Sequence, residues 1–311
     1  MDVFLNLEKL PKFTTPVVTI GTFDGIHLGH QKLIEHLAEK KKRFGGTAVL
    51  ATFEPHPRLV LNNHANSIGL LTTLEEKILI LQDFPIDAMV VIPFSKKLAE
   101  LSGETFIKKI LIQKIAPKDI VIGYDHAFGK NRSGNVETLR KMGAEYGFSL
   151  NVVEPVSLNG QIIKSTAVRQ ALAAGNVVQA QIFLGRSYSL TGTVVKGEGR
   201  GKMSLFPTAN LHIWHPQKLI PANGVYLVLV HWFGRPFQGI ANIGMRPTFS
   251  EKNRSIEVHL FDFNENIYGQ QLQIQFLKRL RDEKKFDSVE ALRAQIQQDI
   301  QEAKKYFDQM N

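Results

Sequence analysis

The pattern of apolar and polar positions divides the chain into two parts that predict different secondary structure. Between residues 17 and 155, short β-branched runs alternate with stretches in which apolar residues have helical spacing. The β-branched runs lie at residues 17–20, 47–53, 88–92, 119–123 and 149–153. Strands that alternate with helices are typical of βαβ units, so we expect a doubly wound, Rossmann-like parallel sheet in this half.

Two of the helical stretches carry signals for their ends. Leu33 and Leu37 have helical spacing, and a glycine pair at 45–46 predicts where that helix stops. Further along, Thr72 precedes Glu75 by three residues, which is the pattern of a capping box. We therefore expect a second helix to begin at Thr72.

Beyond residue 185 the chain changes to strands separated by Gly, Pro and Asn turns. The strand candidates lie at residues 189–197, 224–233, 236–244, 255–263 and 271–280. This pattern predicts a small antiparallel β-barrel or sandwich, followed by one amphipathic helix at about 288–306. A helical pair closes the first half near Gly185, so we predict two domains, residues 1–185 and 186–311.

Composition narrows the class of protein. The chain has 311 residues, 43% hydrophobic and 22% charged, which is ordinary for a globular protein with room for two cores. It has no cysteine, so disulfides and thiolate metal sites are excluded. The first 16 residues lack the pattern of a secretory signal, and no apolar run reaches the roughly 20 residues that span a bilayer. We expect a cytoplasmic protein without a membrane partner. The net charge of +9 favours anionic ligands.

The segment GTFDGIHLGH (21–30) is the first candidate site. It leaves a predicted strand, turns through Gly21 and Gly25, and enters a helix near Gly29. Glycines let a ligand approach the backbone closely, and a helix amino terminus offers unpaired N–H groups with partial positive charge. His27 and His30 can donate hydrogen bonds to phosphate oxygens. We interpret the segment as a phosphate cradle.

The segment alone leaves two alternatives open. It could be a packed turn with incidental histidines, or a metal site that recruits Asp24 and His56. Two further stretches favour the cradle. TFEPHPR (52–58) follows the second strand, and KSTAVRQAL (164–172) begins a helix with a Ser/Thr pair and carries Arg169 one turn later. Together they indicate a nucleotide site that transfers a phosphorus group.

Four segments in order resemble the adenylyltransferase half of bacterial bifunctional riboflavin kinase/FAD synthetases. They are GTFDGIHLGH (21–30), TFEPHPR (52–58), GYDHAFGKNRSG (123–134) and STAVR (165–169). The first and last are similar to the HIGH-type and ISSTxxR-type motifs of the nucleotidyltransferase superfamily. Two positions depart from the family pattern, since His126 replaces a usual Phe and Lys164 replaces a usual Ser.

The resemblance implies three sets of site residues in this half. ATP is surrounded by Gly21, Phe23, Asp24, Gly25, His27, Gly29 and His30. Its phosphates are held by Ser165, Thr166 and Arg169, and the flavin side is lined by Phe53, His56, Pro57, Arg58, Asp125 and Phe128. A phosphate oxygen of FMN is already anionic, so it needs no base to attack the α-phosphorus of ATP. The catalytic groups His27, His30 and Arg169, together with Mg²⁺, then neutralise the leaving pyrophosphate.

KGEGRGKMSLFPTANL (196–211) is the second candidate site. It is not a P-loop, because three residues separate Gly197 from Gly201 and Met203 follows Lys202. A glycine-rich β-turn is the plain alternative. However, FPTAN resembles the riboflavin kinase module, as do four later segments: GVY (224–226), NIGMRPTF (242–249), IEVHLFDF (256–263) and LRDEKKF (280–286).

This second resemblance implies a kinase site. Thr208 and Asn210 hold Mg²⁺ and the phosphates of ATP, and Glu257 is the catalytic base. ATP also binds against Gly197, Gly201 and Lys202. Arg246 and Arg281 lie on the flavin side. Riboflavin attacks with a neutral hydroxyl, which makes a carboxylate useful. Strand alternation independently projects Glu257 and His259 to one face. Lys202 replaces a usual Arg, and Leu205 replaces a usual Gly.

We therefore expect an enzyme that converts riboflavin to FMN and FMN to FAD, with ATP as co-substrate. Its partners are riboflavin, FMN, FAD and ATP. Two alternatives are an aminoacyl-tRNA ligase-like enzyme and a flavin-responsive nucleic-acid-binding protein. Neither is favoured, because the second half carries kinase motifs and no recognition helix with a basic face stands out. We expect no nucleic-acid partner.

Overall fold

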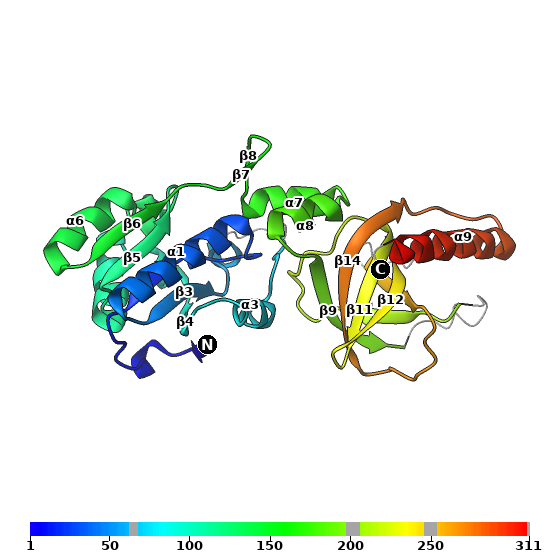
Figure 1. Ribbon diagram of the computed structural model, residues 1–311, viewed down its shortest axis with the longest axis horizontal. Helices are drawn as coiled ribbons and strands as arrows, with labels where there is room; N and C mark the ends of the chain where they lie inside the picture. The colour runs from blue at the N-terminus through cyan, green and yellow to red at the C-terminus, as the bar shows by residue number, and fades with distance from the viewer. Residues whose placement is uncertain (62–67, 197–205, 246–253, 310–311) are drawn as a thin grey trace. The chain divides into compact units, whose positions relative to one another are not determined.

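The computed structural model describes residues 1–61, 68–196, 206–245 and 254–309 (Figure 1). Contacts divide the chain into two compact units, Met1–Ser165 and Thr166–Asn311. The predicted helical pair falls in the second unit, because α8 (Val177–Leu184) packs against barrel strands β9 and β14. That a domain boundary at residue 185 separates two foldable parts stays a prediction.

The first unit is built on a parallel sheet. Its strands are β1 (Asp2–Phe4), β2 (Val17–Ile20), β3 (Ala48–Glu54), β4 (Ala88–Pro93), β5 (Asp119–Gly123) and β6 (Ser149–Val153). They lie in the order β1-β4-β3-β2-β5-β6, and every pairing is parallel. The predicted doubly wound sheet is confirmed. The order reverses between β2 and β5, which is where ligands bind on sheets of this kind.

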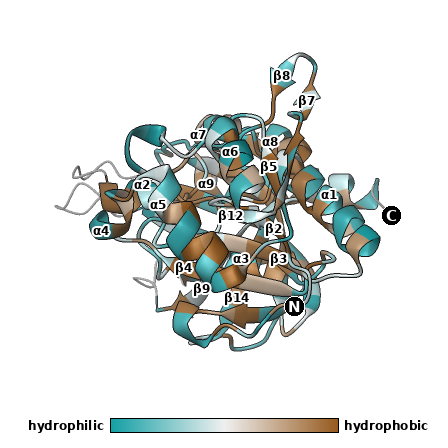
Figure 2. Ribbon diagram, turned by 90° about the vertical axis from the view of Figure 1, so that its left-hand side faces the viewer, coloured by the Kyte–Doolittle hydropathy of each residue, from teal (hydrophilic) through white to brown (hydrophobic). Residues whose placement is uncertain are grey.

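Helices cover both faces of this sheet. They are α1 (Leu28–Phe44), α2 (Pro57–Leu61), α3 (Leu74–Leu81), α4 (Lys96–Ala99), α5 (Gly103–Phe106), the π-helix η2 (Ile107–Ile115) and α6 (Val136–Tyr146). Short 3-10 turns occur at η1 (Leu7–Lys9) and η3 (Lys130–Arg132), and a hairpin joins β7 (Ser157–Leu158) to β8 (Gln161–Ile162). The neighbours Val17 and Val18 belong to two different buried clusters, so both faces of the sheet are apolar. Figure 2 shows α1 with both hydrophobic and hydrophilic residues, as expected for a helix with one face on the sheet.

Helix α3 begins one residue later than the sequence predicts. Its N-cap is Thr73, whose Oγ1 accepts the Glu76 N–H at 3.3 Å while the Glu76 carboxylate accepts the Thr73 N–H at 3.0 Å. The predicted capping box from Thr72 to Glu75 is wrong, because the backbone N–H and hydroxyl of Thr72 both donate to Asp24.

The second unit contains a closed antiparallel barrel. Its strands are β9 (Tyr188–Val195), β10 (Ala209–His212), β11 (Gly224–Trp232), β12 (Arg235–Met245), β13 (Arg254–Leu260) and β14 (Gln271–Arg281). The strand order is β10-β13-β12-β11-β14-β9, and β10 closes the barrel by pairing with both β9 and β13. The predicted barrel is therefore confirmed, with β10 as a strand that the sequence pattern did not indicate.

Helices precede and follow the barrel strands along the sequence. Helix α7 (Ser165–Ala173) and α8 precede it, and α9 (Val289–Asp308) follows it. Ala303 and Phe307 of α9 are buried in a cluster with Val225 and Leu227 of β11. Across the described ranges, no helix combines the length and apolar content that crossing a membrane requires.

Candidate active sites

The loop after β2 has a strained backbone. Phe23 and Ile26 adopt φ angles of 47° and 44°, in the left-handed region, although neither is glycine and both are buried. Such conformations persist only where the surroundings impose them. The Asp24 carboxylate supplies part of that restraint, since its Oδ1 accepts the N–H groups of Leu71 and Thr72 at 3.0 Å each.

Side chains from α1 and α3 hold the same loop. Lys77 donates from Nζ to the Thr22 carbonyl at 2.7 Å and to Thr52 Oγ1 at 3.2 Å, and Gln31 donates to the Ile26 carbonyl at 2.9 Å. Burial lowers the pKa of the Lys77 amine from its ordinary value, although nearby carboxylates oppose this shift. Gly25 takes part in the same network, since its N–H donates to Thr72 Oγ1 at 3.1 Å, so the loop is preorganised.

His27 and His30 meet at the amino terminus of α1. His27 is the N-cap of the helix, and the two imidazole rings stack with centroids 3.7 Å apart. Gly29 makes room for this stack, because a Cβ there would lie 3.1 Å from two His27 ring atoms. Two imidazoles therefore lie beside the positive end of a helix dipole, as an anion site needs.

Ser165, the first residue of the fourth motif, contacts the first motif within the first unit. The Ser165 hydroxyl donates to the Asp24 carbonyl at 2.9 Å, so the start of α7 joins the loop after β2. The backbone at Gly29 also approaches Ile163, since a Cβ there would lie 3.4 Å from the Ile163 carbonyl oxygen. Thr166 and Arg169 follow Ser165 in α7 and belong to the second unit.

A cavity of about 440 Å³ lies in the first unit near these loops. Four of the six residues predicted for the flavin side line it: Phe53, Pro57, Asp125 and Phe128. His56 and Arg58 do not. His56 is buried, and its Nδ1 accepts the Arg58 N–H at 3.2 Å, so this pair begins the short helix α2.

Sequence reasoning missed the aromatic wall of this cavity. Phe94 follows β4 directly, Phe106 ends α5, and both line the cavity together with Leu98. The position of Phe94 just beyond the carboxyl end of a parallel strand was an available signal. Phe106 carried no such signal, because its spacing is that of a core residue.

A cavity of about 430 Å³ lies in the second unit and contains the predicted base. Glu257, Thr208 and Arg281 all line it. Asn210 is directly opposite Glu257 in the pairing of β10 with β13. His259 lines the same cavity, which confirms that alternation along β13 puts Glu257 and His259 on one face. The His259 Nδ1–H donates to the Pro207 carbonyl at 2.9 Å and so anchors the FPTAN segment.

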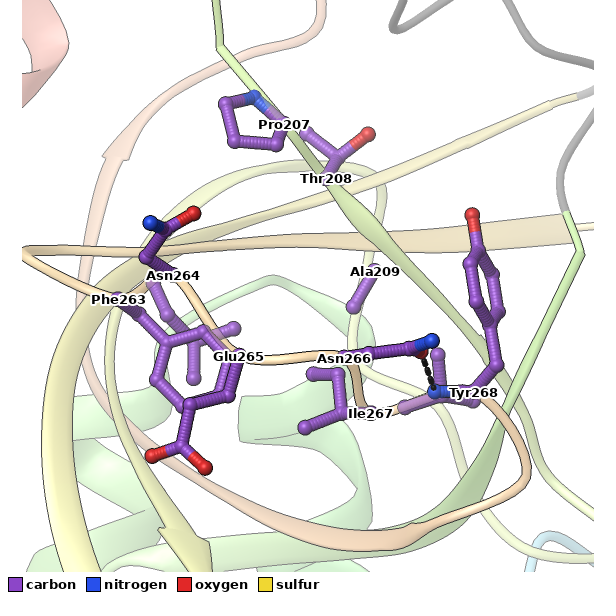
Figure 3. A pocket seen from close by; sticks show the side chains of 11 residues that line it. Pro207, Thr208, Ala209, Phe263, Asn264, Glu265, Asn266, Ile267 and Tyr268 are labelled. Atoms are coloured by element: carbon purple, nitrogen blue, oxygen red, sulfur yellow. Dashed lines mark hydrogen bonds between the residues drawn. The ribbon is translucent and has the colours of Figure 1, made fainter.

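A second barrel cavity, of about 350 Å³, lies next to the first (Figure 3). Thr208 lines both cavities. The rest of the wall comes largely from the connection between β13 and β14, with Phe263, Asn264, Glu265, Asn266, Ile267 and Tyr268 around the space in Figure 3. The sequence motifs include Thr208 and Phe263 but not the residues from Asn264 to Tyr268, since a turn rich in Asn is typical of a surface connection.

Several predicted residues lie outside the described part of the chain. They are Gly197, Gly201, Lys202, Leu205 and Arg246. The alternative interpretation of the first motif is a metal site. Among the described residues, no cluster of three His, Cys, Asp or Glu side chains suited to a metal occurs. The hydroxyl of Thr208 and the amide of Asn210 are hard oxygen donors, which suit Mg²⁺ completed by phosphate oxygens and water.

Comparisons with known proteins match the two parts of the chain to two different family models. Residues 10–167 match the family model for FAD synthetase, and residues 184–307 match that for riboflavin kinase. The bifunctional riboflavin kinase/FMN adenylyltransferase of Buchnera aphidicola subsp. Schizaphis graminum is 40% identical over 97% of both chains. This chain belongs to the bifunctional riboflavin kinase/FMN adenylyltransferase family. The Escherichia coli K12 member is 37% identical over 97% of this chain and 96% of its own.

A solved structure shares the whole fold. It is described as a macrolide-efflux protein from Streptococcus pneumoniae, is 31% identical, has a TM-score of 0.89 and covers 97% of this chain and 98% of its own. Its description names efflux, whereas both family models and the curated relatives name the flavin enzymes. The comparisons thus favour neither the tRNA-ligase nor the nucleic-acid-binding alternative.

In the first unit, the two departures from the family pattern lie together, beside the cavity that Phe53 and Phe128 line. Lys164 pairs with Asp125 at 2.8 Å and lies over the Tyr124 ring, so its charge is directed to the loop after β5. His126 lines the cavity beside Phe128, with ring centroids 5.3 Å apart. Burial lowers the pKa of His126 to about 4, despite the opposing effect of Asp125. The imidazole is therefore neutral at physiological pH and can act as an aromatic wall in place of Phe.

The lowered pKa of His126 predicts an acid-dependent loss of stability. Protonation favours the unfolded chain, where this pKa returns to 6.5, so the stabilisation is complete above pH 6.5 and is lost as the pH falls toward 4. Between pH 7 and 4.5 the loss from this group is roughly 2–3 kcal/mol. Phe cannot be protonated, so His126→Phe should reduce the acid loss by about that amount.

The measurement is urea unfolding of the full-length protein at both pH values, for wild type and variant. Equal acid loss in wild type and His126→Phe would show that His126 is charged in the folded state.

Proposed function

We propose that the barrel unit phosphorylates riboflavin to FMN and that the sheet unit transfers the adenylyl group of ATP to FMN, forming FAD and pyrophosphate. The single observation that carries the kinase assignment is the position of Thr208, which lines both barrel cavities while Glu257 lines one of them. A phosphoryl donor in one cavity and a hydroxyl acceptor in the other would meet at Thr208.

In the kinase site, riboflavin occupies the cavity that contains Glu257. Val225, Ile240 and Leu292 give that cavity apolar walls suited to a flavin ring. Glu257 accepts the proton of the riboflavin 5′-hydroxyl as the hydroxyl oxygen bonds to the γ-phosphorus of ATP. The bond between that phosphorus and the β–γ bridging oxygen breaks, and ADP leaves. ATP binds in the neighbouring cavity, against the connection from Phe263 to Tyr268.

Thr208 and Asn210 would hold Mg²⁺ in this site. When bound, the ion neutralises the negative charge on the phosphates of ATP. Asn210 lies opposite Glu257 across the β10–β13 pair, so one of the two magnesium-binding groups and the base belong to adjacent strands. The pairing of β10 with β13 therefore fixes the distance between the Asn210 amide and the Glu257 carboxylate.

In the adenylyltransferase site, no side chain has to activate the nucleophile. An anionic phosphate oxygen of FMN attacks the α-phosphorus of ATP, the bond to the α–β bridging oxygen breaks, and pyrophosphate leaves. His27 and His30 at the start of α1 stabilise this charge, with Arg169 on the phosphates. The flavin ring packs against the aromatic residues Phe53 and Phe128, which line the cavity. Asp24 acts indirectly, because its carboxylate already restrains the loop.

Two substitutions test the adenylyltransferase site. His27→Ala and Arg169→Ala should each slow FAD formation from FMN by roughly 10²- to 10³-fold, the usual effect of losing a transition-state hydrogen bond. Formation of FMN from riboflavin should continue at the wild-type rate. His36→Ala, in the same helix as His27, is the control and should leave both rates unchanged. Equal loss of both activities would refute the assignment to this site.

Glu257→Gln tests the kinase site. Gln keeps the size of the side chain and its hydrogen bonding but cannot accept the proton, so riboflavin phosphorylation should fall by roughly 10²- to 10⁴-fold. Binding of riboflavin should change much less, because the carboxylate matters chiefly as the hydroxyl loses its proton. FAD formation from supplied FMN should stay normal. A wild-type rate of phosphorylation in this variant would mean that another group is the base.

A further inference from the structure

A buried ion pair joins the end of β14 to the terminal helix. Arg281 donates from Nε to Asp299 Oδ1 at 2.9 Å and from Nη2 to Asp299 Oδ2 at 2.7 Å. The side chains are 16% and 4% exposed. Gln295, one turn earlier in α9, donates to Asp299 Oδ1 at 2.9 Å. Two parallel bonds between a guanidinium and a carboxylate fix the plane of the guanidinium as well as its position.

Two irregularities in the pairing of β11 with β14 put Arg281 on the cavity that Glu257 lines. Val225 pairs with Arg281 whereas Tyr226 pairs with Arg279, and Leu227 pairs with Lys278 whereas Val228 pairs with Phe276, so Leu280 and Leu277 are extra residues in β14. Bulges of this kind re-aim the side chains that follow them. Residues directly opposite each other share a face of the sheet, and Val225 lines the cavity. The two shifts together therefore put Arg281 opposite Val225, where regular pairing from Val228 onward would put Arg279.

The segment after Arg281 forms part of the same wall. Arg281 Nη1 donates to the Asp282 carbonyl at 3.0 Å, and the guanidinium lies 5.8 Å from the centre of the Phe286 ring. Glu283 and Phe286 line the cavity. The conformation of this wall thus depends on a guanidinium that α9 holds in place.

Arg281 keeps hydrogen-bonding capacity for a ligand. A guanidinium has five N–H groups. Among the described residues, three of them are engaged, by Asp299 and the Asp282 carbonyl. A buried pair whose only role is stability gains little over apolar residues of the same size. This pair instead lines a substrate cavity, where a fixed donor is useful.

We propose that Asp299 is a positioning residue for riboflavin phosphorylation. It holds the Arg281 guanidinium in the orientation that donates to the polar edge of the flavin ring, and it thereby orders the wall from Asp282 to Phe286. The terminal helix is part of the substrate site for this reason, with Leu292 and Ile296 on the same cavity. The proposal rests on the kinase function proposed above for this cavity.

Asp299→Asn in the full-length enzyme is the first test. Asn has the same shape but offers one acceptor and one unfavourable donor to the guanidinium. The KM for riboflavin should rise roughly 10-fold or more, as expected for losing a hydrogen bond between charged groups. The KM for ATP and the turnover number should stay within about twofold, because neither Arg281 nor Asp299 lines the ATP cavity. A parallel rise in both KM values would show a structural role and overturn the proposal.

Glu302→Gln is the matched control. Glu302 is in the same helix and pairs with Lys278 at 3.9 Å, but it does not line the cavity. The same change from carboxylate to amide should therefore leave every kinetic constant unchanged. If it raises the KM for riboflavin as much as Asp299→Asn does, the effect belongs to the helix in general and the proposal is wrong.

A double variant keeps the test decisive if Asp299→Asn does not fold. Arg281→Met combined with Asp299→Leu removes both charges and leaves an apolar contact. If Asp299 acts through Arg281, this double variant and Arg281→Met alone should have the same KM for riboflavin within about twofold, since coupled residues are not additive. A further rise in the double variant would overturn the proposal. Wild-type phosphorylation by Glu257→Gln would instead reject the kinase assignment itself.

Discussion

The register of hydrogen-bonded strands determines which side chains meet in both units. In the barrel, the pairing of β10 with β13 puts Asn210 opposite Glu257, and two irregular steps between β11 and β14 bring Arg281 to the cavity that Glu257 lines. In the sheet, parallel alignment brings the loops after β2, β3 and β5 to one edge. Neither arrangement depends on residues that are close in sequence, so both sites exist only once the strands are paired.

The two units place different groups where two different nucleophiles need them. A hydroxyl has to lose a proton, and the barrel supplies a carboxylate on the wall of an apolar cavity. A phosphate monoester is already charged, and the sheet unit supplies imidazoles at a helix amino terminus, with no carboxylate required as a base. Asp24 is present at that site, but its hydrogen bonds make it a restraint on the loop after β2.

Much of the fold could be predicted because buried strands leave continuous apolar runs. The predicted bounds of β2, β5 and β6 agree with the structure. The strands β1 and β10 were missed, since short strands are stabilised by distant partners and have little pattern of their own. Thr72 and Thr73 are each followed three residues later by Glu, and only the long-range bond from Thr72 to Asp24 decides between them.

The candidate sites were predictable where chemistry leaves a local motif. Glu257 and Thr208 belong to such motifs, and the structure brings them to one cavity. Phe106 is spaced like any core residue, and Asp299 looks like a solvated helix carboxylate until Arg281 is placed beside it. Their positions follow from tertiary packing, which no local pattern encodes.

Mixing two inactivated chains tests the central claim, that one chain holds two separate active sites linked by FMN. Glu257→Gln chains and His27→Ala chains are combined in equal amounts with riboflavin, ATP and Mg²⁺, and FAD is quantified over time. The account predicts that the mixture forms FAD much faster than the sum of the two variants alone, because FMN made by one chain is used by the other. FAD formation no greater than that sum would contradict separate sites.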